Sequence, residues 1–428
     1  MKKTLIEVKD TQKEKVILVA LQKPNQDFRE TENSLDELKQ LSLTAGAKVV
    51  KEVIQNREKI ESKTYIGTGK AEEIRNIVKS SGVNTVIFNN DLTPTQQGNL
   101  EGLIDSKVID RTALILDIFA QRAHSGEGKL QVELAQLNYR LPRLKGKGVE
   151  LSRLGGGIGT RGPGETKLEV DRRRINRRIG QLKKELVEID KSRSLQRKQR
   201  KKTNVFNISL VGYTNVGKST LLNTLTGAEV FVQDKLFATL DSTSRKLTLS
   251  DKRETIVSDT VGFIKDLPHQ LIASFKSTLD EVREADLIIH VVDASHLGLE
   301  DQIISVEKIL EEIGVSDKLQ ITVFNKADKV DEIKFRRLRR IFPDAIFVSA
   351  LKNEGVEDLL RVVNEMASNE TIKTTLEVPY DKGVVIQKAY NLGKVISEKH
   401  VLLGTILEVE IPKIYLSDFK SFFKKDKK

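Results

Sequence analysis

One glycine-rich segment, GYTNVGKS at Gly212 to Ser219, constrains this chain more than any other feature. It follows a short apolar run at 206–211, which predicts a strand, and leads into the apolar-periodic run 220–225, which predicts a helix. Glycines between a strand and a helix let the backbone turn tightly, so that successive N–H groups and the positive end of the helix dipole can surround phosphate oxygens. The segment therefore predicts an α/β domain that binds a nucleotide by its phosphates.

Further motifs follow this phosphate-binding loop in order, most of them where a predicted strand ends. They are Thr239, DTVG at Asp259 to Gly262, NKAD at Asn325 to Asp328, and Ser349-Ala350. Asp328 selects the base, because its carboxylate can accept two hydrogen bonds from the ring N–H and exocyclic amine of guanine, and adenine lacks this donor pair. NKAD alone could be a polar turn. In this order, however, the set predicts a switch that binds and hydrolyses GTP.

Each motif predicts a role in nucleotide or metal binding. Lys218 is expected to neutralise the β- and γ-phosphates, and Ser219, Thr239 and Asp259 are expected to hold Mg²⁺, with Asp259 acting through water. The Gly262 backbone should reach the γ-phosphate, so Lys218, Thr239 and Gly262 are the candidate catalytic residues. Thr243 is the alternative to Thr239. The residues expected to contact the nucleotide are Gly212, Tyr213, Thr214, Asn215, Val216, Gly217, Lys218, Ser219, Thr220, Asp259, Thr260, Val261, Gly262, Asn325, Lys326, Asp328, Ser349 and Ala350.

Two positions refine the expected chemistry. Many small GTPases place a Gln after the Asp-x-x-Gly motif to orient the attacking water, but here that position is Phe263. Either another group positions the water or a partner completes the site, so the free protein should hydrolyse GTP slowly. Asn215 is a candidate ligand for K⁺ beside the phosphates, where a cation can offset transition-state charge. The alternative is that Asn215 only shapes the loop.

The charge of the chain is concentrated in one region. The 428 residues include 72 Lys and Arg and 61 Asp and Glu, for a net charge of +11. Residues 143–202 alone hold 20 basic and 7 acidic residues, a net +13 that leaves −2 for the rest. Positive charge concentrated in this way favours a polyanionic partner such as RNA.

Composition also bounds the setting of the protein. The absence of cysteine excludes disulfides and thiolate metal sites and fits a cytosolic protein. The N-terminus does not look like a secretory signal, and no stretch approaches the ~20 apolar residues of a membrane span. We therefore expect a cytoplasmic protein that is a monomer when free, with peripheral association with a membrane left open.

Two apolar stripes with coiled-coil spacing lie in and beside the basic region and predict an antiparallel helical hairpin. They are Leu130, Leu134, Leu137 and Leu141, then Leu168, Ile175, Ile179, Leu182, Leu186 and Ile189. Between them, 146–165 holds eight glycines. A floppy connector is the simpler interpretation, but glycine at the tip of a basic hairpin suits a probe that enters an anionic cavity. For the basic helix, a solvated coiled-coil face is the alternative to RNA contact. The candidate RNA-binding residues are Arg153, Gly155, Gly156, Gly157, Arg161, Arg172, Arg173, Arg177 and Arg178.

The rest of the chain predicts α/β domains on either side of the hairpin. Before it, strands alternate with helices, including a helix from an N-cap at Ser34 and a strand at 64–67, which indicates a parallel sheet. At the C-terminal end, strand-like runs at 374–378 and 405–411 flank a helix-like run. We expect a multidomain α/β protein with an N-terminal α/β domain at 1–123, a helical hairpin with a glycine-rich tip at 124–203, a GTPase domain at 204–370 and a small C-terminal α/β domain at 371–428.

Over essentially its whole length the chain resembles the HflX family of ribosome-associated GTPases. The resemblance rests on LGGGIGTRGPGETKLEVDRRRI at 154–175, DRTALILDIFAQRAHSGEGKLQVELAQLNYRLPRL at 110–144, the YIGTGKAEE turn, and FATLD together with DTVGF. It implies binding to the large ribosomal subunit and its RNA, splitting of stalled or idle ribosomes, and stimulation of hydrolysis by the ribosome. It also implies an apolar residue at Phe263. ATP-dependent RNA unwinding, credited to some members, stays open because the N-terminal part has no Walker motif. A subunit-assembly GTPase and a nucleotide-gated protein-interaction switch remain the alternatives.

Overall fold

The computed structural model of the chain divides into two compact units. The first contains Met1–Val187, Gln233–Asp241 and Lys265–Lys276, and the second contains Glu188–Val232, Ser242–Ile264 and Ser277–Lys428. A parallel four-stranded sheet in the first unit and a mostly parallel six-stranded sheet in the second confirm the predicted α/β class. The four domain boundaries stay a prediction. The structure describes residues 13–24, 27–144, 163–202, 205–227, 236–240, 242–250, 253–265, 276–316, 318–369, 371–392, 394–412 and 416–423.

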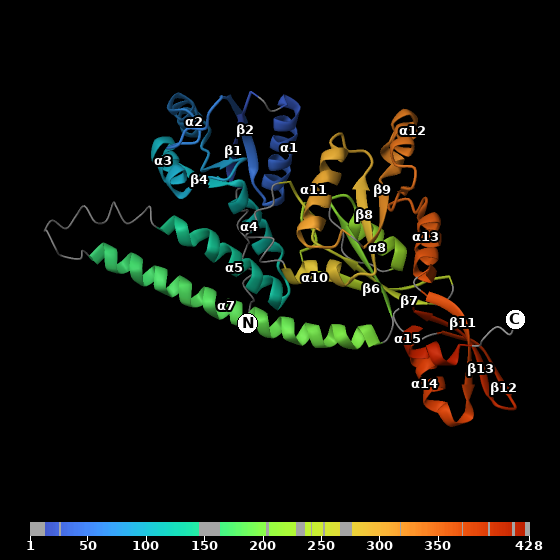
Figure 1. The fold of residues 1–428 in the computed structure, drawn as a ribbon. Coiled ribbons are helices and arrows are strands. Elements are labelled where there is room, and N and C mark those ends of the chain that lie inside the picture. The colour runs from blue at the N-terminus through green and yellow to red at the C-terminus, as the bar shows by residue number, and fades with distance from the viewer. Residues whose placement is uncertain are drawn as a thin grey trace, which may run out of the picture. The chain divides into compact units, whose positions relative to one another are not determined.

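The first unit is built on a parallel sheet in the order β2-β1-β3-β4, which we call the N-terminal sheet. Its elements are β1 (Lys15–Gln22), α1 (Phe28–Thr44), β2 (Lys48–Asn56), α2 (Thr68–Ser81), β3 (Thr85–Phe88), α3 (Pro94–Ile104), β4 (Lys107–Asp110) and α4 (Arg111–Arg122). Helices α2 and α3 cover one face and α1 the other (Figure 1), because the central strands are apolar on both sides. The segment 64–67, predicted as a strand, is a turn closed by a bridge between Glu61 and Tyr65.

The predicted start of the first helix is also wrong. Helix α1 begins at Phe28, and its N-cap is Asp27, whose carboxylate accepts a hydrogen bond in the first turn. Ser34 lies inside the helix, where its hydroxyl accepts a hydrogen bond from the Asn89 amide at 2.9 Å. The first turn is mostly polar, so the apolar periodicity that marks the rest of the helix does not reveal it.

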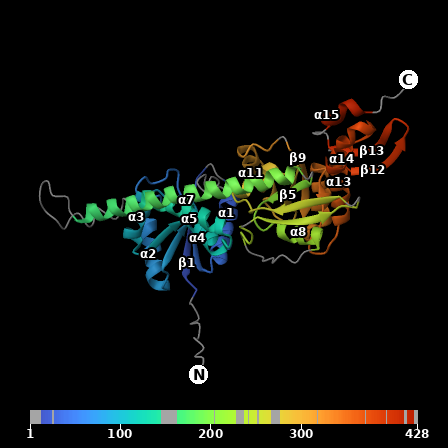
Figure 2. The same cartoon turned by 90° about the horizontal axis from the view of Figure 1, so that it is seen from below.

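Helices α5 (Gly126–Arg143) and α7 (Pro163–Lys202) are the two arms of the predicted hairpin and run side by side in Figures 1 and 2. Leu134, Ile179 and Leu182 are buried between them, surrounded by partly buried apolar side chains. These partly buried residues are Leu130, Leu137, Leu141, Ile175 and Leu186. The coiled-coil seams are confirmed over this set. Ile189 is not part of it, and the side chain of Leu168 lies outside the described residues.

The second unit contains a sheet in the order β10-β9-β8-β5-β7-β6, in which β6 is antiparallel and the other strands are parallel. The elements of this part of the chain are β5 (Phe206–Gly212), α8 (Lys218–Thr226), β6 (Thr243–Thr248), β7 (Glu254–Asp259), α10 (Lys276–Glu284), β8 (Leu287–Asp293), α11 (Leu299–Glu312), β9 (Leu319–Asn325), α12 (Glu332–Ile341), β10 (Ile346–Phe347) and α13 (Val356–Asn369). The predicted motifs follow the carboxyl ends of β5, β7, β9 and β10, the edge where open α/β sheets bind ligands.

The C-terminal part of the second unit forms an antiparallel sheet in the order β11-β13-β12. Its elements are β11 (Thr371–Pro379), α14 (Gly383–Leu392), β12 (Lys394–Val401), β13 (Gly404–Pro412) and α15 (Leu416–Phe419). Strand β12 was not predicted, because it is an edge strand with a mixed polar and apolar sequence. Among the described residues, none of the helices combines the length and apolar character needed to cross a membrane.

Candidate nucleotide-binding site

The phosphate-binding loop joins β5 to α8, as its sequence predicts. Gly217 immediately precedes α8 with a φ of 94°, a backbone conformation that disfavours side chains. A Cβ added to Gly217 would lie 2.3 Å from the amide nitrogen of Asn325. That amide donates to the Val216 carbonyl at 2.8 Å, so the NKAD motif directly supports the phosphate-binding loop. Only glycine at 217 leaves room for this contact.

Lys218 is buried at the start of α8. Its Nζ donates to the Gly212 carbonyl at 3.1 Å and to the Tyr213 carbonyl at 2.9 Å. Burial lowers the pKa of Lys218 from 10.5 to about 8, although the negative charge of Asp259 raises it. Burial and the charge of Lys218 lower the pKa of His290 on β8 to about 4, so His290 is neutral at pH 7. The amine therefore lies in a poorly solvated place where a phosphate would be a strongly favourable partner.

The two metal-binding candidates in the second unit lie together. The Ser219 hydroxyl donates to Asp259 Oδ2 at 2.6 Å, and Asp259 is buried at the end of β7. A hydroxyl and a carboxylate are the hard oxygen donors that Mg²⁺ prefers, so the residues present fit this ion. The third candidate, Thr239, belongs to the segment Gln233–Asp241 of the first unit, and its role as a ligand stays a prediction. Thr243 begins β6 opposite Asp259.

Backbone hydrogen bonds join the phosphate-binding loop to Phe263, the residue that follows the DTVG motif. The Phe263 N–H donates to the Gly212 carbonyl at 3.1 Å, and the Thr214 N–H donates to the Phe263 carbonyl at 2.7 Å. A Cβ added to Gly262 would lie 2.7 Å from Thr214 Cα and 3.1 Å from Lys218 Nζ, so a glycine is required for this approach. The Phe263 side chain is buried, which agrees with the expectation that it orients no water.

The base-side motifs also converge on the loop. Asn325 Oδ1 accepts from the Ala350 N–H at 3.0 Å, and Lys326 Nζ donates to the Asn215 carbonyl at 2.9 Å. A hydrogen bond from Ser349 lowers the pKa of the Asp328 carboxyl, and the charges of nearby lysines lower it further. The carboxylate that is expected to select guanine is therefore ionised and braced by the Ser349-Ala350 motif.

The remaining predicted residues divide into four groups. Val216 and Val261 are buried, and the Thr260 hydroxyl donates to the Leu210 carbonyl at 2.7 Å, so these positions offer the nucleotide backbone groups rather than side chains. Thr220 lies in the first turn of α8. Arg172, Arg173 and Arg177 are exposed on α7, whereas Arg178 makes two hydrogen bonds of 2.7 Å to Glu133 on α5. Arg153, Gly155, Gly156, Gly157 and Arg161 lie outside the described residues.

Sequence reasoning missed one residue that shapes the site. Asp293 ends β8, and its carboxylate lies 2.7 Å from Lys326 Nζ. Burial raises the pKa of Asp293, but hydrogen bonds from Lys326 and Ser295 outweigh it and lower the pKa overall. Asp293 thus orients the lysine of the NKAD motif. The sequence does contain a sign of this role, because Asp293 is a polar residue at the carboxyl end of a central parallel strand, where ligands bind.

The chain is similar to known proteins over most of its length. Three family models match successive parts of the chain, described as GTP-binding GTPase N-terminal at 32–120, GTP-binding GTPase middle region at 122–200 and 50S ribosome-binding GTPase at 207–326. The crystal structure of a GTP-binding protein from Sulfolobus solfataricus in complex with GDP is 28% identical and covers 83% of this chain and 99% of that chain, with a TM-score of 0.44.

Two relatives match nearly the full length. GTPase HflX of Caldanaerobacter subterraneus is 48% identical over 399 residues, which is 93% of this chain and 91% of that protein. GTPase HflX of Escherichia coli is 42% identical over 381 residues, which is 88% of this chain and 89% of that protein. Because the similarity spans the hairpin and the nucleotide motifs alike, the chain belongs to the HflX family and is an enzyme that binds and hydrolyses GTP.

Proposed function

We propose that this GTPase docks on the large ribosomal subunit through the α5–α7 hairpin and uses its GTP state to separate the subunits of stalled or idle ribosomes. The observation that carries the proposal is the outer face of α7, where Arg172, Arg173, Arg174 and Arg177 are exposed while the opposite face packs on α5. Exposed arginines along one helix face suit the phosphates of structured RNA. The description of the model that matches 207–326 as a ribosome-binding GTPase gives independent support.

The nucleotide reaction follows from the positions of the chain's own groups. Lys218 is expected to exchange the Gly212 and Tyr213 carbonyls for phosphate oxygens, which brings a cation to the charge that develops during phosphoryl transfer. Ser219 and Asp259 would hold Mg²⁺, with Thr239 as the third ligand. When bound, this ion would supply positive charge that offsets the negative charge of the phosphates.

The residue after Gly262 supports the proposal that a partner completes the site. Phe263 is buried and its backbone is hydrogen-bonded to the phosphate-binding loop, so it offers the attacking water no side-chain partner. Docking on the ribosome would supply or position the missing group. The protein alone should therefore turn over slowly, as a cytoplasmic monomer, and accelerate on ribosomes.

Sedimentation of ribosomes through a sucrose gradient tests the proposal. Intact ribosomes incubated with the protein and a non-hydrolysable GTP analogue should appear as separate subunits, with the protein in the large-subunit fraction. Shortening the segment 154–164 should abolish this separation and leave GTP binding intact. Full separation by the shortened protein would show that the segment is only a connector.

The charge of α7 is tested separately with matched triple variants. Arg172, Arg173 and Arg177 replaced by Gln should weaken ribosome binding and flatten its dependence on salt. Replacing three exposed arginines of α12 by Gln removes the same charge elsewhere and should have no such effect. These control residues are Arg336, Arg337 and Arg340. Equal loss in both variants would mean that only net charge matters, and no loss in either would refute RNA contact by α7.

The binding and sedimentation assays also distinguish two alternative functions, and a separate assay tests K⁺. Binding to free subunits without separation of intact ribosomes would favour the subunit-assembly alternative, and salt-insensitive binding would favour a protein partner. K⁺ is proposed as a second cation beside Asn215, whose backbone carbonyl accepts a hydrogen bond from Lys326. Hydrolysis at equal rates in K⁺ and Na⁺ of equal ionic strength would remove this role.

A further inference from the structure

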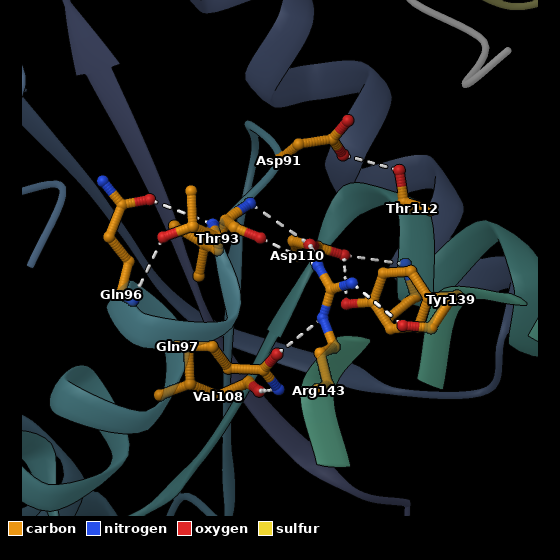
Figure 3. A network of polar contacts seen from close by, with 11 residues as sticks. Asp91, Thr93, Gln96, Gln97, Val108, Asp110, Thr112, Tyr139 and Arg143 are labelled. Carbon is orange, nitrogen blue, oxygen red and sulfur yellow. Dashed lines mark hydrogen bonds and ion pairs between the residues drawn. The ribbon is translucent and has the colours of Figure 1, made fainter. Parts of the chain in front are cut away.

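The end of the first hairpin helix is held by a polar cluster at the edge of the N-terminal sheet (Figure 3). Arg143, the last residue of α5, donates to the Leu92 carbonyl at 2.8 Å and to Asp110 Oδ2 at 3.0 Å. Its Nε donates to Gln97 at 3.0 Å, and its guanidinium carbon lies 3.5 Å from the centre of the Tyr139 ring. The side chain of Asp110 is 1% exposed and that of Arg143 is 19% exposed, so the pair is largely shielded from water.

Asp110 is the centre of this cluster. Its carboxylate accepts from the Tyr139 hydroxyl at 2.8 Å, from the Ala113 N–H at 2.9 Å and from the Leu92 N–H at 3.2 Å, in addition to Arg143. Burial raises the pKa of this carboxyl above its usual value, and these hydrogen bonds and the charge of Arg143 offset that rise only in part. Removing one partner of a buried ion pair strongly destabilises the fold, because the other charge is left buried and unpaired. Arg143 and Asp110 therefore hold each other in place.

The cluster occupies a place where α/β domains usually bind ligands. Asp110 ends β4 and Leu92 follows β3, so both lie at the carboxyl edge of the N-terminal sheet. Here the side chain of Arg143 contacts both of these residues. The helix alone holds its last turn less firmly, because Pro142 has no N–H to donate to the carbonyl of Asn138. The cluster compensates for this missing helical hydrogen bond.

We propose that Arg143, acting with Asp110 and Tyr139, is a positioning residue for ribosome docking, because it holds the C-terminal end of α5, from which the chain continues to residue 145, on the edge of the N-terminal sheet. Holding one end of a binding element in place in advance lowers the entropic cost of association. The inference rests on the proposed function in one respect, namely that the α5–α7 hairpin docks on the ribosome.

Distances measured without ribosomes test the positioning directly. The chain has no cysteine, so introduced cysteines can carry spin labels. Labels at Leu144→Cys and at Ser80→Cys, an exposed position on α2, report how firmly the end of α5 is held to the N-terminal sheet. Arg143→Met should broaden the distance distribution. An unchanged distribution would overturn the proposal.

A double variant separates positioning from stability. Arg143→Met leaves Asp110 buried without its cation, so its unfolding midpoint should fall. Asp110→Asn combined with Arg143→Met removes both charges and keeps a good N-cap for α4, so it should regain most of the midpoint. The double variant should keep the broad distance distribution of Arg143→Met, and like that single variant it should fail to separate ribosomal subunits. Recovery of subunit separation together with stability would show that the cluster is only structural.

The matched control removes another buried ion pair from the same sheet edge. Arg111 on α4 pairs with Glu37 on α1, with side-chain exposures of 6% and 15%, so this pair joins two helices outside the hairpin. Arg111→Met with Glu37→Gln should keep the narrow distribution and full subunit separation. All variants should bind GTP normally. If the wild-type protein separates no subunits, the proposed function fails, and the spin-label distances still decide the positioning.

Discussion

The lowered pKa of Lys218 leads to a quantitative prediction of how GTP binding depends on pH. Its amine must be charged to hold phosphates, but burial lowers its pKa to about 8. The negative charge of Asp259 opposes this shift, and His290, with a pKa of about 4, does not titrate in the same range. GTP binding should therefore draw in a proton wherever part of the protein starts with a neutral lysine.

The expected magnitude follows from that pKa. With a pKa of about 8, roughly 10% of Lys218 is neutral at pH 7, about half at pH 8 and roughly 90% at pH 9. Proton uptake on binding should rise in the same proportion, and GTP affinity should fall about tenfold between pH 7 and pH 9. The folded pKa lies below the unfolded value of 10.5, so the unfolded chain binds more protons between these values. Stability without nucleotide should thus increase from this group as the pH rises through that window, by roughly 3 kcal/mol in all.

Calorimetry in buffers with different ionisation enthalpies measures this uptake. The observed binding enthalpy should depend on the buffer at pH 8 to pH 9 and much less at pH 7. Lys218→Arg keeps its charge throughout this range, so any GTP binding by this variant should show no such uptake. Buffer-independent enthalpies at pH 8.5 together with a flat affinity from pH 7 to pH 9 would refute the reasoning, because Lys218 would then be fully charged before GTP binds.

Three substitutions test other parts of the structure. Asp328→Asn should lose GTP and gain xanthosine triphosphate, with each charge-assisted bond contributing roughly 1.5–3 kcal/mol, and unchanged GTP affinity in a binding titration would contradict the base assignment. Asn325→Ala removes the hydrogen bonds to Val216 and Ala350. It should lower the free energy of unfolding, measured with denaturant, by about 1–3 kcal/mol per group left unsatisfied, and it should also weaken GTP binding. Leu182→Ala, at a fully buried hairpin position, should cost about 2–5 kcal/mol and speed hydrogen exchange in α5 and α7 while GTP binding persists.

The nucleotide site could be predicted because its residues are tied to strand ends that are visible in the sequence. Gly212, Asp259 and Asn325 each end a strand of the same sheet, so a motif search also places them in space. What the sequence could not show is how the motifs support one another. The Asn325 side-chain amide binds both Val216 in the phosphate-binding loop, 109 positions away in the sequence, and Ala350, 25 positions away.

Local pattern also fails where tertiary contacts decide the outcome. The start of α1 at Phe28 has a polar first turn, and β12 becomes a strand through its pairing with β13. The Arg143 cluster is another case. In the sequence Arg143 is one basic residue at the start of a basic region, and only the fold brings it to Asp110 and Leu92. Charge pattern alone assigns it to the surface.

Not every arginine of the basic region 143–202 is available to bind phosphates. Arg143 is paired with Asp110, and Arg178 is paired with Glu133. The exposed face of α7 retains Arg172, Arg173 and Arg177 among the candidates, and the Arg173–Glu169 pair at 3.5 Å is too exposed to hold Arg173 firmly.

Because each lost phosphate contact lowers the salt slope of binding by about one unit, the triple variant of these three residues should lower it by at most about three. Arg178→Gln should lower the salt slope little and loosen the hairpin instead, because its bidentate pair with Glu133 links α5 to α7. A full unit lost from the slope in Arg178→Gln, with the hairpin intact by hydrogen exchange, would mean that the ion pair opens on the ribosome and that Arg178 transfers from Glu133 to RNA.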